Sequence, residues 1–193
     1  DSIYLTQCQV YVLIIINISC WYNPLMRIIG IDPGYDRLGI AVIEKPAKGK
    51  PDKKEILLYS SCLKTSAKDS IYVRLQEIGQ EITRVLNEFK PDQLAIENLF
   101  ITKNQKTAMR VAEARGIILY EAQKRGIPIR EYSPMEIKLA VTGDGGSDKL
   151  RMTKMVGLLI KTPENPKKKA ANKMLDDEYD AIAVALAHSA IIR

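Results

Sequence analysis

The 193-residue sequence is poor in histidine, cysteine and phenylalanine. It contains one histidine, His188, and three cysteines, Cys8, Cys20 and Cys62, which do not have metal-ligand spacing. These numbers argue against a zinc site built from His and Cys and against a catalytic triad that needs histidine. Because only Cys62 lies beyond residue 25, a disulfide framework is also disfavoured, and the cysteine content fits a reducing, cytoplasmic compartment.

Residues 1–25 contain no lysine or arginine, unlike the sequence that follows them. Their apolar run, residues 10–16, is too short to span a bilayer, and no positive segment precedes it as in a secretory signal. Met26 comes directly before the first strand-like run. We therefore expect the natural start at Met26, residues 26–193 as the functional domain, and no membrane partner. An extra strand or a membrane-associating segment is the alternative for residues 1–25.

The length of the chain suits one domain with a sizeable core. The net charge at pH 7 is +6. A moderately basic balance is compatible with a polyanionic partner such as nucleic acid, but does not require one.

The pattern of apolar residues predicts an α/β fold with a five-stranded mixed sheet and helices on both faces. The first three strands have short connections and should form an antiparallel meander. Pro134 stands at the first position of a short helix with a capping box, and Ser147 is the expected cap of the helix after it. The expected strands are 28–32, 38–44, 56–63, 94–97 and 127–132, and the expected helices are 70–90, 105–125, 134–143, 148–160 and one that begins near residue 175.

Acidic residues stand at the ends of these predicted buried elements. Asp32 ends the first strand and Glu97 ends the fourth, while Asp177 and Asp180 lie three residues apart on one face of the last helix. If the first and fourth strands are neighbours, Asp32 and Glu97 lie side by side, and the last helix can bring its two acids over them. Each acid has an ordinary explanation by itself, as a turn cap, an exposed strand end or a partner of the helix dipole. Their joint occurrence favours a functional site.

Clustered carboxylates repel one another unless cations hold them together. Oxygen ligands without His or Cys suit Mg²⁺ or Mn²⁺. Two such ions, about 3.5–4 Å apart, can activate a water molecule and stabilise the leaving oxygen in phosphodiester hydrolysis. The sequence therefore predicts a divalent-cation site formed by these acids.

Four segments of the sequence occur in the order and spacing of the RuvC family, the bacterial Holliday junction resolvases with the ribonuclease H-like fold. The resemblance covers essentially residues 26–192. It implies a homodimeric, magnesium-dependent endonuclease that nicks two strands of a four-way DNA junction symmetrically, together with branch-migration motor proteins of the same pathway. The segments are 31–34 (IDPG), 95–100 (AIENLF), 112–116 (AEARG) and 177–181 (DEYDA).

The resemblance also assigns roles to individual residues. The matching catalytic and metal-binding carboxylates are Asp32, Glu97, Asp177 and Asp180, with two Mg²⁺ ions per site and Mn²⁺ as a substitute. Lys138 and Lys149 match lysines that contact phosphates, and Phe100 matches an aromatic residue that stacks on bases at the junction. Without the resemblance, the two lysines would be read as solvated charges and Phe100 as a core residue.

Two features depart from the pattern of the family. Residues 167–175 form a longer and more basic segment than is usual there, and Asp176 precedes Asp177, so the identity of the third ligand stays open.

His188 lies two turns beyond Asp180, about 12 Å along a helix that rises 1.5 Å per residue, and is expected to be a packing residue.

Other functions are compatible with parts of this pattern. The Asp-Pro-Gly turn also resembles the first phosphate loop of actin-like and sugar-kinase ATPases, which need a second glycine-rich phosphate loop that we do not find. A nuclease of the same fold that acts on RNA is a closer alternative. A junction-binding protein without catalytic activity is a third, and the complete set of four acids argues against it.

Overall fold

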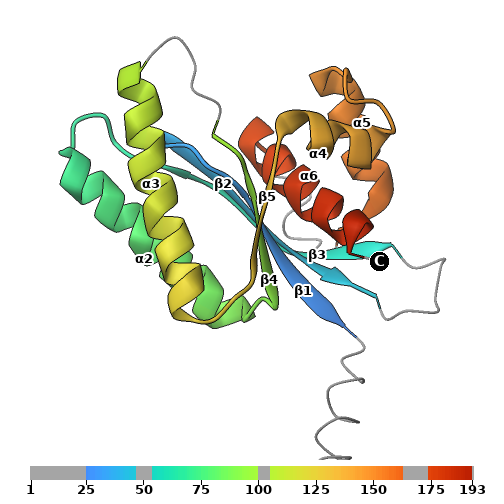
Figure 1. Ribbon diagram of the computed structural model, residues 1–193, viewed down its shortest axis with the longest axis horizontal. Coiled ribbons are helices and arrows are strands. Elements are labelled where there is room, and N and C mark those ends of the chain that lie inside the picture. The colour runs from blue at the N-terminus through green and yellow to red at the C-terminus, as the bar shows by residue number, and fades with distance from the viewer. Residues whose placement is uncertain (1–24, 47–53, 100–104, 163–173, 193) are drawn as a thin grey trace, which may run out of the picture.

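The computed structural model describes residues 25–46, 54–99, 105–162 and 174–192, which form one mixed sheet between two groups of helices (Figure 1). Phe100 and most of the segments 1–25 and 167–175 lie outside these residues. In chain order the elements are β1 (Met26–Asp32), β2 (Arg37–Lys45), β3 (Glu55–Lys64), α2 (Ile71–Phe89), β4 (Gln93–Glu97), α3 (Gln105–Lys124), β5 (Ile129–Tyr132), α4 (Pro134–Thr142), α5 (Lys149–Leu159), β6 (Ile160–Lys161) and α6 (Asp176–Ile191).

The sheet has the strand order β5-β4-β1-β2-β3-β6. β1, β2 and β3 form the expected antiparallel meander, and β4 pairs in parallel with β1 on one side and β5 on the other. The prediction of five strands was wrong by one. After α5 the chain becomes extended, and Ile160 and Lys161 pair in parallel with Glu55 and Ile56 at the edge of β3. A strand of two residues is too short to produce a periodic signal in the sequence.

Helices cover both faces of the sheet, as predicted. Figure 1 shows α2 and α3 on one side and α4, α5 and α6 on the other. Alternate residues of β1 point into the two cores, because successive side chains of a strand face opposite sides. Ile29 and Ile31 pack with residues of α2 and α3, whereas Ile28 packs with the apolar part of α6.

Two glycines let α6 lie directly on the sheet. A Cβ atom at Gly30 would come within 2.3 Å of the Ala181 carbonyl oxygen, and one at Gly39 within 2.2 Å of the Asp177 carbonyl oxygen. Any larger residue at either position would push the helix away. Gly39 pairs with Asp32 across the β1–β2 ladder, so the second close approach also brings the start of α6 to the end of β1.

Of the two helix caps predicted from the sequence, one is confirmed and one is wrong. Ser133 and Glu136 form the expected capping box of α4, and Ser70 caps α2. The cap of α5 is Asp148, whose side chain accepts a hydrogen bond from the Arg151 backbone N–H at 2.8 Å, and not Ser147 as predicted. Ser147 is instead buried, with its hydroxyl oxygen 2.6 Å from that of Thr142.

Candidate metal centre

Asp32 and Glu97 lie side by side at the ends of neighbouring parallel strands. Ile31 of β1 pairs with Ile96 of β4, so the next residue of each strand is the acid. The residues that directly precede the two acids, 28–31 in β1 and 94–96 in β4, are buried, whereas the acids themselves are partly exposed. The expectation that the first and fourth strands are neighbours is confirmed, and two carboxylates emerge together at this edge of the sheet.

The first turns of α6 bring two more acids to the same edge. Asp177 reaches it through the close packing of its backbone on Gly39, and Asp180 lies one turn further along the helix. The charges of Glu97, Asp180 and Asp177 all raise the pKa of Asp32, so the structure gathers the four predicted acids. Asp176 is exposed, and its carboxylate lies 3.1 Å from the Lys149 ammonium. Its charge, like that of Asp177, raises the pKa of Asp180.

The acids of this cluster are poorly compensated. Burial, followed by the charges of Glu97, Asp180 and Asp177, raises the pKa of Asp32 to about 7. Burial also raises the pKa of Glu97 and that of Asp180, although Lys138 opposes the first shift and Lys149 the second. Such shifts mean that the negative charges are costly where they stand. A set of oxygen donors with excess negative charge fits a hard divalent cation such as Mg²⁺ or Mn²⁺.

Two of the four acids are paired with cationic side chains. Arg37, at the start of β2, forms an ion pair with Asp177 through the carboxylate atom Oδ2, and the Cys62 thiol donates a hydrogen bond to that same atom at 3.5 Å. The Lys149 ammonium lies 3.7 Å from Asp180 Oδ2. In the described part of the chain, no three acidic, histidine or cysteine side chains are close enough together to form a ready-made metal site.

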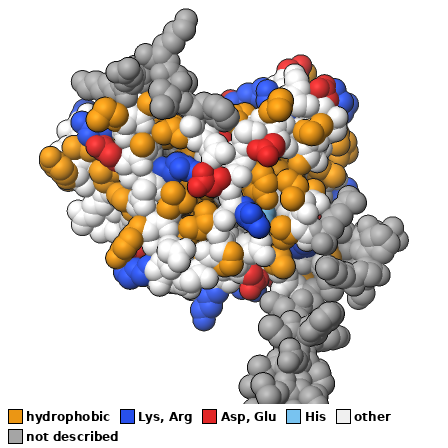
Figure 2. Space-filling view, in the orientation of Figure 1, with side chains coloured by type: hydrophobic (Ala, Val, Ile, Leu, Met, Phe, Trp, Pro, Cys, Tyr) orange, Lys and Arg blue, Asp and Glu red, His pale blue; other side chains and the backbone are white. Residues whose placement is uncertain are grey.

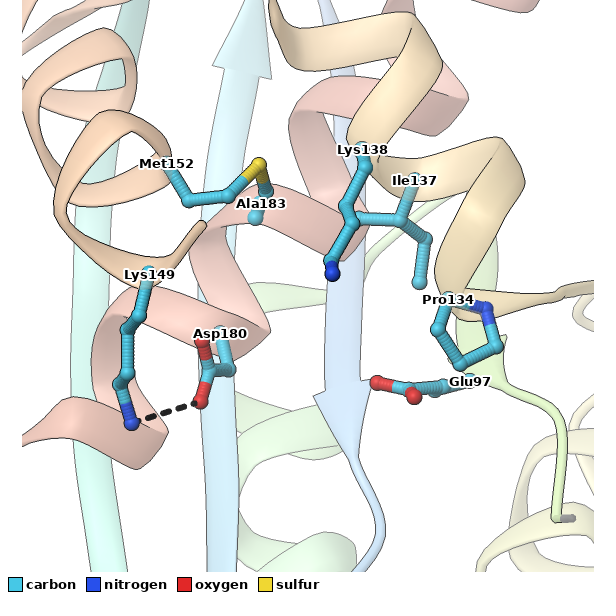
Figure 3. A pocket seen from close by; sticks show the side chains of 8 residues that line it. All are labelled: Glu97, Pro134, Ile137, Lys138, Lys149, Met152, Asp180 and Ala183. Carbon is cyan, nitrogen blue, oxygen red and sulfur yellow. Dashed lines mark ion pairs between the residues drawn. The ribbon is translucent and has the colours of Figure 1, made fainter. Parts of the chain in front are cut away.

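A pocket of about 230 Å³ opens beside the acids (Figure 3). Glu97 and Asp180 point into it, and the two predicted phosphate-binding lysines approach from different helices, Lys138 from α4 and Lys149 from α5. Pro134, Ile137, Met152 and Ala183 form its apolar wall. The pocket therefore places two positive charges within reach of a group that is held at the carboxylates.

Sequence reasoning missed the two neighbours of Asp177. Arg37 follows the turn after Asp32, two residues before Gly39, the partner of Asp32 in the ladder. Cys62 pairs with Gly39 from the other side, in β3. The predicted meander would have placed both near Asp32, but their contact with Asp177 depends on a helix that lies more than 100 residues later in the sequence.

His188 has a structural position, as expected. Its side chain is fully buried, with Nδ1 lying 2.6 Å from the Tyr132 hydroxyl oxygen and Nε2 facing the side-chain oxygen Oε1 of Gln93. Burial, with smaller effects from Arg130 and Lys45, lowers its pKa to about 4. It is therefore neutral near pH 7 and does not face the acids.

Charged side chains are dispersed on the face in Figure 2. Among the described residues visible there, basic and acidic groups stand singly between apolar ones, without a large patch of one sign. In the regions with described structure, no helix has the length and apolar character needed to cross a membrane.

Comparison with known proteins gives consistent matches over most of the chain. The family described as crossover junction endodeoxyribonuclease RuvC matches residues 28–188. The protein of that name from Thermosipho melanesiensis is 42% identical over 160 residues, which cover 83% of this chain and 94% of the relative. The one from Brevibacillus brevis is 37% identical over 164 residues, or 85% of this chain and 92% of the relative.

A solved structure agrees with these relatives. Thermus thermophilus RuvC in complex with a Holliday junction substrate superimposes with a TM-score of 0.74 at 32% identity, covering 87% of this chain and 95% of that one. The structural match therefore extends over most of both chains.

Proposed function

Because the chain belongs to the RuvC family of crossover junction endodeoxyribonucleases, we propose that it resolves Holliday junctions in DNA recombination and repair by hydrolysing phosphodiester bonds. The observation that carries this proposal is the cluster of four acids at one edge of the sheet, beside a pocket with two lysines. The relative from Thermus thermophilus is described in complex with a four-way substrate of this kind.

Asp32, Glu97, Asp177 and Asp180 are the residues that would hold the cations. Two Mg²⁺ ions, or Mn²⁺ in their place, would supply an activated water and would stabilise the charge on the leaving oxygen. Asp177 is the better candidate than Asp176 for the third ligand, because its charge acts on Asp32 whereas Asp176 is exposed and faces Lys149. Asp32 has to lose its proton to act as a ligand, which its raised pKa makes harder below about pH 7.

The two lysines would hold the substrate. Lys138 and Lys149 line the pocket from separate helices, so each can neutralise a phosphate on its own side of the carboxylates. In the hydrolysis, the oxygen of a water molecule forms a bond to phosphorus, and the P–O bond to the leaving strand end breaks. The leaving oxygen takes up one proton of that water, directly or through the solvent. The Ile137 and Met152 side chains keep one wall of the pocket apolar, which limits the space for competing water.

The assembly follows from the substrate. A four-way junction offers two equivalent strands, and symmetric nicking of both requires two sites related by a two-fold axis. We therefore propose a homodimer. From the resemblance to the family we further propose branch-migration motor proteins as partners and Phe100 as the residue that stacks on bases at the crossover, and from the low cysteine content we propose action in the cytoplasm.

A nicking assay with labelled synthetic substrates tests this function. The full chain, in Mg²⁺, should nick a four-way DNA junction in two opposed strands and should leave duplex and single-stranded DNA of the same sequence largely intact. Equal cleavage of an RNA–DNA hybrid would favour the nuclease that acts on RNA. Tight junction binding without cleavage would favour the non-catalytic binding protein.

A further inference from the structure

The four acids of the candidate metal centre are unequally covered by positive charge. The Asp177 carboxylate oxygen Oδ2 is the acceptor for both the Arg37 guanidinium and the Cys62 thiol, and Asp180 has Lys149 at 3.7 Å. Within the residues that the structure describes, neither Asp32 nor Glu97 is in an ion pair. The two acids on α6 thus have built-in counter-ions, and the two acids of the sheet do not.

Arg37 is more exposed than the carboxylate with which it pairs. Its side chain comes from the first residue of β2 and is 46% exposed, whereas Asp177 is only 20% exposed. The guanidinium therefore lies on the solvent side of the carboxylate, and its long side chain can leave without disturbing the core. Its planar fork also suits two oxygens of a phosphate group.

We propose that Arg37 is a resident counter-ion, which a divalent cation displaces from Asp177 and which then binds a phosphate of the junction. A cation held by the acids would neutralise the negative charge that retains the guanidinium and would also repel the guanidinium directly. The released side chain, which starts from an exposed position, could then turn toward a phosphate of a bound junction. This inference rests on the proposed function, because it needs both the metal centre and the DNA.

The direction in which cation affinity changes when Arg37 is removed distinguishes this role from a purely positioning role. If Arg37 competes with the cation, its removal makes the cation bind more tightly. If Arg37 instead holds the Asp177 carboxylate in the orientation needed for ligation, its removal makes the cation bind more weakly. The Cys62 thiol, the second donor to the same oxygen, stays in place in either case.

The first experiment is a titration of the full chain with Mn²⁺ at pH 8 without DNA, in which free Mn²⁺ is followed by electron paramagnetic resonance. Arg37→Gln should lower the dissociation constant about two- to fivefold, the range that corresponds to loss of an exposed ion pair. Arg37→Lys keeps the positive charge and should stay close to the unmodified chain. An unchanged or weaker affinity in Arg37→Gln overturns the proposal.

Arg84→Gln is a matched control for this titration. Arg84 is also 46% exposed and pairs with an acid, Glu81, that is 20% exposed, but it belongs to α2 on the other face of the sheet. Its replacement should leave Mn²⁺ affinity unchanged. Asp32→Asn reports on the metal centre itself. If the unmodified chain binds no Mn²⁺, or if Asp32→Asn binds it equally well, the proposed metal centre fails and this inference fails with it.

The second experiment measures junction binding against salt concentration, once in Ca²⁺ and once in a chelator. In Ca²⁺, Arg37→Gln should reduce the slope of log affinity against log salt by about one, the value for one lost phosphate contact. In the chelator the guanidinium is held by Asp177, so the two slopes should agree. Equal slopes of the variant and the unmodified chain in Ca²⁺ overturn the phosphate contact and with it the proposal.

Discussion

Replacement of Asp32 by asparagine should make the metal-free protein more stable while removing its activity. The pKa of Asp32 rises from 3.8 to about 7, chiefly through burial and then through the neighbouring acids. An acid whose pKa is raised by folding destabilises the folded state once both states are ionised. Asparagine has nearly the same shape and carries no charge, so it should relieve this cost.

The magnitude follows from the size of the shift. About three pKa units correspond to roughly 4 kcal/mol at 1.36 kcal/mol per unit. Asp32 ends a strand and is partly exposed, so solvent screening reduces this to about 1–3 kcal/mol. For a chain of this length, we expect the melting temperature in a chelator at pH 8 to rise by roughly 2–10 °C.

The pH dependence has a definite sign. The folded form of Asp32 stays protonated up to about pH 7, whereas the unfolded form ionises near 3.8. The cost in the unmodified chain therefore grows as the pH rises from about 4 to 7 and is constant above that range. The advantage of Asp32→Asn should be full at pH 8 and should shrink steadily as the pH falls toward 4.

The assay is thermal or chemical unfolding at pH 8 and pH 4.5, with chelator and with Mg²⁺. Mg²⁺ should stabilise the unmodified chain by binding to its folded state and should have little effect on Asp32→Asn. Glu88→Gln, an exposed acid paired with Arg84, is the control and should change stability by less than about 0.5 kcal/mol. If Asp32→Asn were no more stable than the unmodified chain in chelator at pH 8, the charge in this cluster would not be a burden, and the argument for a cation there would be refuted.

Three other predictions concern the substrate contacts and the start of the chain. Lys138→Ala and Lys149→Ala should each lower junction affinity or rate and reduce its salt slope by about one, and unchanged values in both variants would return these lysines to the solvated surface. Phe100→Ala should lose junction cleavage with its fold intact, because stacking on a base contributes about 1–3 kcal/mol, whereas a melting temperature lowered by many degrees with activity per folded molecule preserved would identify a core residue. A chain that starts at Met26 should be as active and as stable as the full chain, and a large loss of melting temperature would show that residues 1–25 pack on the domain.

The position of each strand-end acid could be predicted because it depends on a local pattern, since Asp32 and Glu97 each end a short apolar run. The pairing of β1 with β4 was only a condition in the sequence analysis, because β2, β3 and α2 separate these strands in the chain. Once the two strands pair in parallel, the side-by-side position of the acids follows from the register. The spacing of Asp177 and Asp180 likewise puts them on one helical face whatever the tertiary structure is.

The contacts that complete the site could not be predicted in the same way. The pairing of Arg37 with Asp177 joins residues 140 positions apart and depends on how closely α6 approaches Gly39. Serine and aspartate are both good caps, so the sequence does not distinguish Ser147 from Asp148 as the cap of α5. The structure does, because Ser147 is buried against Thr142 and Asp148 accepts the hydrogen bond from the Arg151 backbone. Local sequence propensity does not predict these packing contacts.

The most direct test of the account is cleavage of a four-way junction by Glu97→Gln. Glutamine removes one ligand charge from the acid cluster and keeps the size of the side chain, so the fold and the lysine contacts should persist. We predict that the unmodified chain nicks the junction in Mg²⁺, that Glu97→Gln does not, and that both bind the junction with similar affinity in Ca²⁺. Nicking by Glu97→Gln at a rate close to that of the unmodified chain would contradict the assignment of this acid cluster as the hydrolytic centre.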